Sequence, residues 1–266
     1  MKHISILFLI GWVTLTVNLF AAENWVVLKT DASGKTEVEG NAVLADQKFT
    51  PASTFKVMIA WAALEEGLVT PKTKHLVKDS YVPGAPRELD LHEALYFSSN
   101  DYFDWLGKKL GREKLEKYIA ISGYAGGKPP KGWLDNMDLV ERGGTITITP
   151  RENQEFFYKL QQGPDCFQQK KPVSSEAVMM MLRTVLRWPN ANAEAMLWGK
   201  TGAAGGAVWF IGYGTRATES GVNWTQAVTV FAKGGVELRP MMIDKFYAAY
   251  GNKFDKTWLK EYPFEK

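Results

Sequence analysis

The spacing of apolar and polar residues predicts strands near both ends of the chain and helices between them. Two short segments flank an Asp-Ala-Ser-Gly sequence with turn composition, which predicts strands over 25–29 and 35–39. Towards the other end, apolar runs separated by glycine-rich turns predict strands over 193–199, 208–215 and 224–232.

The middle of the chain carries helix signals. Val57–Glu66 is a run of helix-forming residues that stops at Gly67. Thr149-Pro-Arg-Glu152 is a capping box with proline at the first helical position, which predicts a helix ending near residue 161. Further helices are expected at 91–110 (broken around 98–100), 174–187 and 241–250, with loops at 80–90 and 123–132. This order predicts an α+β fold, in which an antiparallel sheet is built from both chain ends and a helical region is inserted.

The first 22 residues resemble a secretory signal. Lys2 and His3 precede an uncharged stretch, Ile4–Ala22, which ends in two alanines. A retained membrane anchor is the alternative, because 19 residues are just enough to span a bilayer. We therefore expect a signal peptide at 1–22 and one domain at 23–266, located in the periplasm or outside the cell. That domain would stay at the membrane only if the signal were uncleaved, and otherwise has no stable membrane partner.

Composition excludes several classes of function. With 32 Lys and Arg against 29 Asp and Glu, the net charge of +3 is too even to predict binding to nucleic acid. The chain has one Cys, which excludes an internal disulfide framework, and only three His, so we expect no metal and no bound organic cofactor. The composition leaves the oligomeric state open.

Three short motifs follow one another along the chain: Ser53-Thr-Phe-Lys56, Ser98-Ser99-Asn100 and Lys200-Thr201-Gly202. Each is weak alone, because S-x-x-K is often only a helix cap followed by a solvated lysine. In this order, behind a secretion signal, they strongly indicate a serine acyl-transferring enzyme.

The chemistry of the first motif supports this interpretation. A serine hydroxyl is a poor nucleophile unless a base removes its proton, and Lys56 lies one helical turn from Ser53. Lysine acts as a base only when burial or chemical change removes its charge, and its neighbours Phe55 and Val57 are apolar. The N–H of Ser53 at the helix start can help to hold an oxyanion.

The motifs resemble those of class D (OXA-type) serine β-lactamases, within the penicillin-recognising serine enzymes. Pro51-Ala-Ser-Thr-Phe-Lys56 is highly specific for that class. Gly199–Gly202 followed by Val208–Tyr213 is similar to the family's K-T-G strand and the strand after it. Gly132-Trp133-Leu134 resembles its F-W-L segment.

The resemblance implies hydrolysis of the β-lactam amide bond through an acyl-enzyme on Ser53, with small-molecule β-lactams as substrates and antibiotic resistance as the outcome. Lys56, N-carboxylated by carbon dioxide, would be the base, and Trp133 would donate its indole N–H to that carbamate. Ser98 would pass a proton to the leaving nitrogen. The N–H groups of Ser53 and Ala203 would form the oxyanion hole. Residues implied in substrate binding are Lys200, Thr201, Gly202, Arg239 and Asn100.

One motif departs from the class D pattern. Asn100 stands where the family usually has valine, and an amide at this position can hydrogen-bond Lys56. Two other functions stay open. A penicillin-binding sensor that acylates with little turnover is favoured by Asn100 and by the possible anchor. A D,D-peptidase acting on peptidoglycan stem peptides is favoured by the S-x-N motif.

Overall fold

The computed structural model describes residues 23–135, 137, 139–161, 174–190, 195–216 and 224–260. The expected signal peptide at 1–22 and the first residues of the strand expected at 193–199 lie outside this part of the chain. Within the described ranges, none of the helices combines the length and the apolar character that a bilayer span requires.

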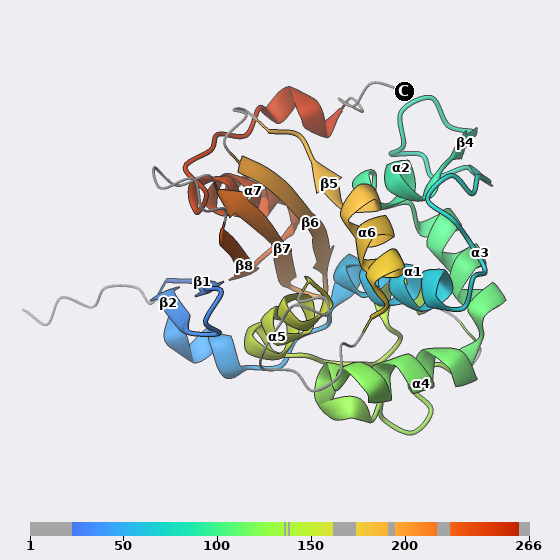
Figure 1. Cartoon of the computed structure of the whole chain (residues 1–266), viewed down its shortest axis with the longest axis horizontal. Helices are drawn as coiled ribbons and strands as arrows, with labels where there is room; N and C mark the ends of the chain where they lie inside the picture. Colours follow the sequence, from blue (N-terminus) through green and yellow to red (C-terminus); the bar gives the residue numbers. More distant parts are fainter. Residues whose placement is uncertain are drawn as a thin grey trace, which may run out of the picture.

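The central sheet has six antiparallel strands in the order β2-β1-β8-β7-β6-β5 (Figure 1). β1 pairs with β8, with Val26 opposite Phe231, so the two ends of the described chain meet in the middle of the sheet. The predicted α+β fold, with its sheet built from both chain ends, is therefore confirmed. The strands are β1 (Trp25–Thr30), β2 (Thr36–Gly40), β5 (Arg187–Trp188), β6 (Ala195–Ala204), β7 (Ala207–Arg216) and β8 (Trp224–Lys233).

The segment between β2 and β5 is mainly helical. Its helices are α1 (Lys56–Glu65), α2 (Leu91–Tyr96), α3 (Asn100–Leu110), α4 (Arg112–Ser122), α5 (Pro150–Gln161) and α6 (Glu176–Val185), and α7 (Arg239–Ala248) follows β8. Short 3-10 helices are η1 (Ala42–Asp46), η2 (Ala52–Phe55), η3 (Tyr124–Gly127), η4 (Val140–Arg142), η5 (Val236–Leu238) and η6 (Lys256–Leu259). A small hairpin pairs β3 (His75–Val77) with β4 (Arg87–Leu89).

Most predicted elements are present, but one helix was missed and one expected loop contains a strand. The capping box of α5 forms as predicted: Glu152 N donates to Thr149 Oγ1 at 3.0 Å, and Thr149 N donates to Glu152 Oε2 at 2.9 Å. The sequence analysis did not predict α4, because its many charged residues make the helical spacing of its apolar residues hard to recognise. The loop expected at 80–90 contains β4, a three-residue strand too short to show alternation.

The two faces of the sheet are buried against different layers (Figure 1). On β7, Val208 and Phe210 face α7, and the Phe210 ring lies 4.0 Å from the ring of Phe246, centroid to centroid. Trp209 and Ile211 alternate to the other face and belong to the core of the helical region. The sheet is thus enclosed between α7 on one side and the helical region with α5 on the other.

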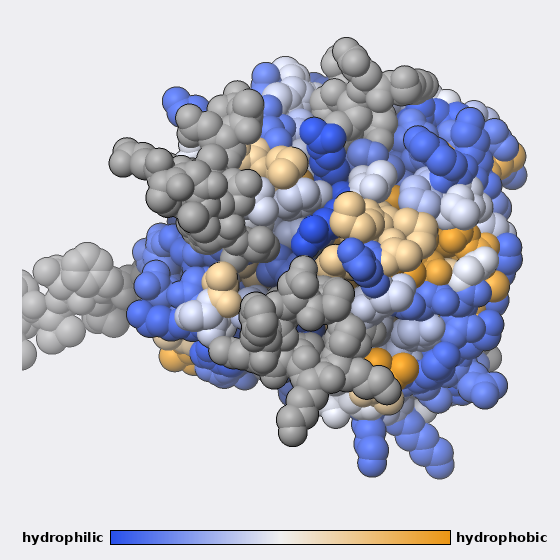
Figure 2. All heavy atoms as spheres, in the orientation of Figure 1, coloured by the Kyte–Doolittle hydropathy of each residue, from blue (hydrophilic) through white to orange (hydrophobic). Residues whose placement is uncertain are grey.

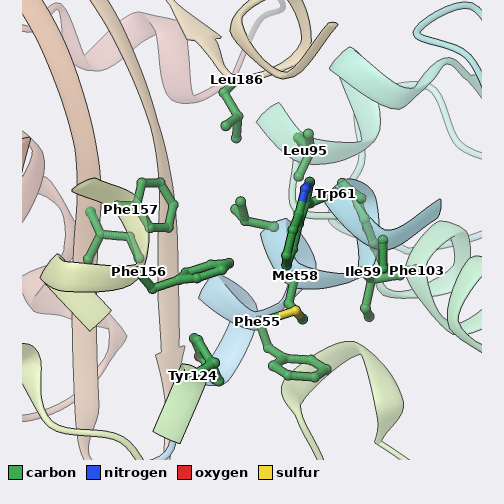
Figure 3. Packing of buried hydrophobic residues seen from close by; sticks show 14 of the residues in the cluster. Phe55, Met58, Ile59, Trp61, Leu95, Phe103, Tyr124, Phe156, Phe157 and Leu186 are labelled. Atoms are coloured by element: carbon green, nitrogen blue, oxygen red, sulfur yellow. The ribbon is translucent and has the colours of Figure 1, made fainter. Parts of the chain in front are cut away.

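Helix α1 lies at the centre of the helical region. Every residue from Lys56 to Leu64 is buried, and the helix has no polar face. Figure 3 shows that side chains from α2, α3 and α5, including Leu95, Phe103 and Phe156, surround α1. A lysine at the first position of this helix is therefore held inside a hydrophobic core.

Helix α6 helps to shield α1 from solvent. Its inner residues Val178 and Leu182 are buried, and the helix packs against α1 and α2. Met180 on its outer side is 53% exposed. Figure 2 shows a hydrophobic patch over α6 on a face that is otherwise mostly hydrophilic.

Candidate active site

Ser53 lies in the tight turn η2, directly before α1. The turn is closed by Thr54, whose N and Oγ1 donate to Pro51 O at 3.2 and 2.7 Å. Ala52 adopts a left-handed backbone (φ 49°), a conformation that is strained for alanine and is typical of functional sites. Ser53 is half-buried between fully buried neighbours, and Lys56 N donates to its carbonyl. The predicted spacing of one turn is confirmed, although the turn is 3-10 rather than α-helical.

The Lys56 side chain is fully buried and has fixed acceptors. Its Nζ donates to Ser98 O at 2.6 Å and to Asn100 Oδ1 at 2.7 Å, and lies 3.3 Å from Ser98 Oγ. Burial lowers the pKa of this amine to about 7, although the carboxylates of Glu141 and Asp79 oppose that effect. This lowered pKa makes the uncharged form of the Lys56 amine accessible near neutral pH. A neutral amine uses its two N–H groups on these acceptors, which leaves its lone pair to take a proton.

The Ser98-Ser99-Asn100 turn is held from outside by two residues of the loop after β3. Tyr81 Oη donates to Ser98 O and accepts from Asn100 N, both at 3.0 Å. The buried Asp79 carboxylate accepts from Ser99 Oγ and, at 3.2 Å, from Asn100 N. Ser98 itself has a left-handed backbone (φ 59°), which this network stabilises. The turn thereby aims its carbonyl at Lys56.

The third motif, on β6, lies beside the turn that carries Ser53. A Cβ placed on Gly202 would lie 3.1 Å from Thr54 N and 3.2 Å from Pro51 O, closer than ordinary van der Waals contact, so a larger residue here would have to push these backbone atoms away. Lys200 is buried and donates to Thr201 O at 2.8 Å. Burial, followed by the charges of Lys56 and Arg239, holds the pKa of Lys200 well below its usual value. The fold therefore brings the three sequence motifs together.

Positive charge gathers at this site. Arg239, at the start of α7, is half-buried, and its Nε is enclosed without a hydrogen-bond partner among the described residues. Burial lowers the pKa of Arg239, and its charge acts on both Lys56 and Lys200. The Arg239 guanidinium favours an anionic ligand at this site. Ala203 follows Gly202 on β6, so its backbone is close to the Ser53 turn, while the oxyanion role of the two N–H groups stays a prediction.

Trp133 is placed differently from the expectation. Its indole N–H donates to Glu116 Oε1 on α4 at 2.9 Å, and its ring packs edge-on against Phe55 at 5.9 Å. The indole N–H is thus bonded to Glu116 of α4, a helix that was not predicted and that supplies a carboxylate acceptor. The expected role of Trp133 towards a modified Lys56 stays a prediction.

The residues around Lys56 do not fit a carbamate. A carbamate has one N–H and two anionic oxygens, so it needs several donors. The amine instead faces two acceptors, Ser98 O and Asn100 Oδ1, and the expected donor Trp133 is bonded to Glu116. The donor and acceptor set of this site suits a free amine.

Comparison with known proteins identifies the family. The family described as "Penicillin binding protein transpeptidase domain" matches residues 29–266. The chain belongs to this transpeptidase family. It is homologous to OXA-type class D β-lactamases: β-lactamase OXA-19 of Pseudomonas aeruginosa is 26% identical over 214 residues, 75% of each chain.

The similar proteins also include a regulatory protein and a solved class D β-lactamase structure. The regulatory protein BlaR1 of Bacillus licheniformis is 29% identical over 177 residues, which cover 62% of this chain but only 27% of that protein. Among solved structures, a class D β-lactamase, YbXI, from Nostoc aligns with a TM-score of 0.70 at 23% identity, covering 85% of this chain and 93% of that one. This structural likeness extends the agreement in fold to nearly the whole domain.

Three residues near this transpeptidase-type site were missed by the sequence analysis: Asp79, Tyr81 and Glu141. Asp79 and Tyr81 precede the S-x-N motif by about twenty residues and form no recognised pattern with it. Glu141 lies in a segment that showed no element signal. Only the three-dimensional arrangement relates these side chains to Lys56.

Replacement of Tyr81 by phenylalanine tests the support of the S-x-N turn. Loss of the two hydrogen bonds that Tyr81 Oη makes frees the Ser98 carbonyl, and we expect acylation by a fluorescent penicillin to slow about tenfold. Tyr158→Phe is the matched control, because that hydroxyl donates to Ala32 O in the turn between β1 and β2. Equal acylation rates in the two variants would contradict a positioning role for Tyr81.

The pKa of Lys56 predicts a pH dependence. If Lys56 serves as the base it must be uncharged, so a pH below its pKa protonates the amine and removes activity. We expect the acylation rate constant to fall about tenfold per pH unit below a midpoint of about 7. Stopped-flow acylation between pH 5 and 9 (roughly, the range over which such a group titrates) measures this profile. A rate that is flat across neutral pH would contradict the assignment of Lys56 as the base.

Proposed function

We propose that this domain hydrolyses β-lactam amide bonds through an acyl-enzyme on Ser53. The observation that carries the proposal is the Lys56 amine, which is fully buried one turn from a half-exposed serine and has both N–H groups directed at fixed acceptors. Such an amine can take a proton from a hydroxyl at neutral pH, which converts Ser53 into a nucleophile.

Acylation then follows from the neighbouring groups. Ser53 Oγ bonds to the lactam carbonyl carbon while its proton passes to Lys56 Nζ. The lactam C–N bond breaks, and the proton held by Lys56 Nζ passes through Ser98 Oγ, 3.3 Å away, to the departing nitrogen, so that Lys56 returns to its neutral form and Ser98 keeps its hydroxyl. Water later cleaves the Ser53 ester and restores the hydroxyl.

The cationic side chains supply the specificity for β-lactams. Penicillins and cephalosporins carry a carboxylate beside the lactam ring, and a guanidinium binds carboxylates in a bidentate manner. Arg239 has an enclosed Nε that has no hydrogen-bond partner among the described residues, and Lys200 lies buried on the neighbouring strand β6. The printed names of relatives such as β-lactamase OXA-19 support the same substrate class.

For the base we propose the unmodified amine of Lys56. N-carboxylation by carbon dioxide is the alternative, expected from class D relatives, and the acceptors around Lys56 argue against it. We also propose export from the cytoplasm, on the basis of the apolar segment at 1–22. Antibiotic resistance would be the consequence of turnover in that location.

A sensor that acylates without turnover is the second candidate. It is favoured by the match to the regulatory protein BlaR1 and by Asn100, which binds Lys56 where class D proteins usually have valine. A D,D-peptidase is the third, favoured by the family description and by the S-x-N motif. The three functions differ in what happens to the acyl-enzyme and in which substrate forms it.

Turnover and adduct lifetime distinguish these functions. We expect multiple turnover of nitrocefin with a transient adduct in intact-protein mass spectra, and we expect Ser53→Ala to lose both. A stoichiometric, lasting adduct would instead select the sensor, and release of D-alanine from a pentapeptide with slow nitrocefin turnover would select the peptidase. Labelling that survives in Ser53→Ala would contradict the nucleophile assignment.

Bicarbonate tests the chemical state of the base. If Lys56 acts as a free amine, hydrolysis in carbon-dioxide-depleted buffer should equal hydrolysis in bicarbonate within about twofold. Trp133→Phe should then lower stability through the lost bond to Glu116 without adding bicarbonate dependence. Activity that appears only with bicarbonate would restore the carboxylated lysine.

A further inference from the structure

The 3-10 helix η4 (Val140–Arg142) packs beside the turn that carries Ser53. A Cβ placed on Gly143, the next residue, would lie 3.0 Å from Phe55 Cγ and 3.2 Å from Pro51 Cγ. At its other end, Val140 Cγ2 would lie 2.7 Å from a Cβ placed on Gly107 of α3. The segment is therefore held between η2 and α3, the two elements that supply Ser53 and Asn100.

Tight turns fix the backbone of this segment. Gly143 N donates to Val140 O at 3.1 Å, and Gly144 N donates to Leu139 O at 3.1 Å. Leu139 has a left-handed backbone (φ 56°), a conformation that is costly for leucine and commonly found beside functional groups. The residue between these turns, Glu141, is therefore held in one place.

Glu141 carries a buried carboxylate with little else to bind. The residue is 5% exposed, and the only polar side chain that pairs with it in the described part of the chain is Arg142, whose Nε lies 3.0 Å from Glu141 Oε1. Burying a carboxylate is unfavourable, and a surface pair with a sequence neighbour offsets little of that cost. We therefore expect this buried carboxylate to take part in the chemistry of the site.

Glu141 is also the carboxylate that interacts most strongly with Lys56. Among the acids of the described residues, its charge raises the pKa of the Lys56 amine most, and that of Asp79 is second. The oxygens of Asp79 are occupied, however, because they accept from Ser99 Oγ and from the backbone N–H groups of Asn100 and Asp101. Glu141 is thus the anion near Lys56 whose oxygens are not committed to shaping the S-x-N turn.

We propose that Glu141 is a second general base of this site and activates the water that hydrolyses the Ser53 ester. This inference rests on the proposed β-lactam hydrolysis. The Glu141 carboxylate takes one proton of the water as the water oxygen bonds to the ester carbonyl carbon. The C–Oγ bond of Ser53 then breaks, and the proton held by Glu141 returns to Ser53 Oγ with the Lys56 amine as relay. Ester and water are consumed, and a free carboxylic acid and the serine hydroxyl are formed.

This division of labour agrees with the donors and acceptors of the site. Lys56 is held towards the turn between α2 and α3 by Ser98 O and Asn100 Oδ1. Glu141 belongs to a different segment, which contacts the nucleophile turn through Phe55 and Pro51. The anionic base that the site lacks when Lys56 is an unmodified amine is then supplied by a side chain of the chain itself.

The test separates acylation from deacylation in Glu141→Gln. Single-turnover stopped-flow gives the acylation rate with nitrocefin, and time-resolved mass spectrometry gives the decay of the adduct. We expect acylation to change by less than about threefold and deacylation to slow by about a hundredfold or more, so that the adduct accumulates.

Two matched controls remove a salt bridge without removing Glu141. Arg142→Gln deletes the partner of Glu141, and Glu155→Gln deletes the exposed pair of Glu155 with Lys159 on α5. Glu155→Gln should keep deacylation within about threefold of the unaltered protein, whereas Arg142→Gln leaves the Glu141 carboxylate in place and should slow deacylation far less than Glu141→Gln does. If Arg142→Gln slowed deacylation as strongly as Glu141→Gln, Glu141 would act only through its ion pair and the proposal would be wrong.

The remaining outcomes are also decisive. Fast turnover in folded Glu141→Gln overturns the role of Glu141 and leaves the hydrolase proposal intact. An adduct that the unaltered protein never releases overturns both, because a working water base would release it. If Glu141→Gln does not fold, Glu141→Asp carries the test. Its carboxylate is one methylene closer to the backbone, so deacylation should slow while acylation does not. A deacylation rate equal to that of the unaltered protein overturns the proposal.

Discussion

The burial of a single amine determines how this site works. Lys56 occupies the first position of a helix that has no solvent-facing side, and desolvation lowers its pKa to about 7. Water around an ammonium would restore its charge and remove the base. The packing of α2, α3, α5 and α6 around α1 therefore buries the helix that begins with this amine.

The other parts of the site are arranged around that amine. Ser98 O and Asn100 Oδ1 fix its orientation, and Tyr81 and Asp79 fix the turn that carries these acceptors. On the opposite side, glycine in the K-T-G motif lets β6 approach the Ser53 turn closely. Ala52 and Ser98, in the two turns that meet at Lys56, both have a left-handed backbone. Strained backbone of this kind clusters at functional sites, where the surrounding structure stabilises it.

Sequence reasoning recovered what depends on local pattern. The three motifs, the capping box of α5 and the sheet built from both ends follow from residue types at short spacing, and the role of Asn100 as a partner of Lys56 follows from its amide. What it missed depends on long-range contact. The indole N–H of Trp133 donates to Glu116, which lies on the unpredicted helix α4. Glu141 belongs to no motif that links it to Lys56, a residue 85 positions earlier (141 minus 56).

The most direct test of the account is the titration of Lys56 itself. NMR of protein labelled with carbon-13 at lysine Cε, with Lys56→Met to assign the signal, follows each amine separately. The account predicts one resonance, absent from the variant, that titrates with a pKa of about 7. A Lys56 signal that titrates near the ordinary lysine value of about 10.4, or a carbamate carbon signal on Lys56 after addition of labelled bicarbonate, would contradict it.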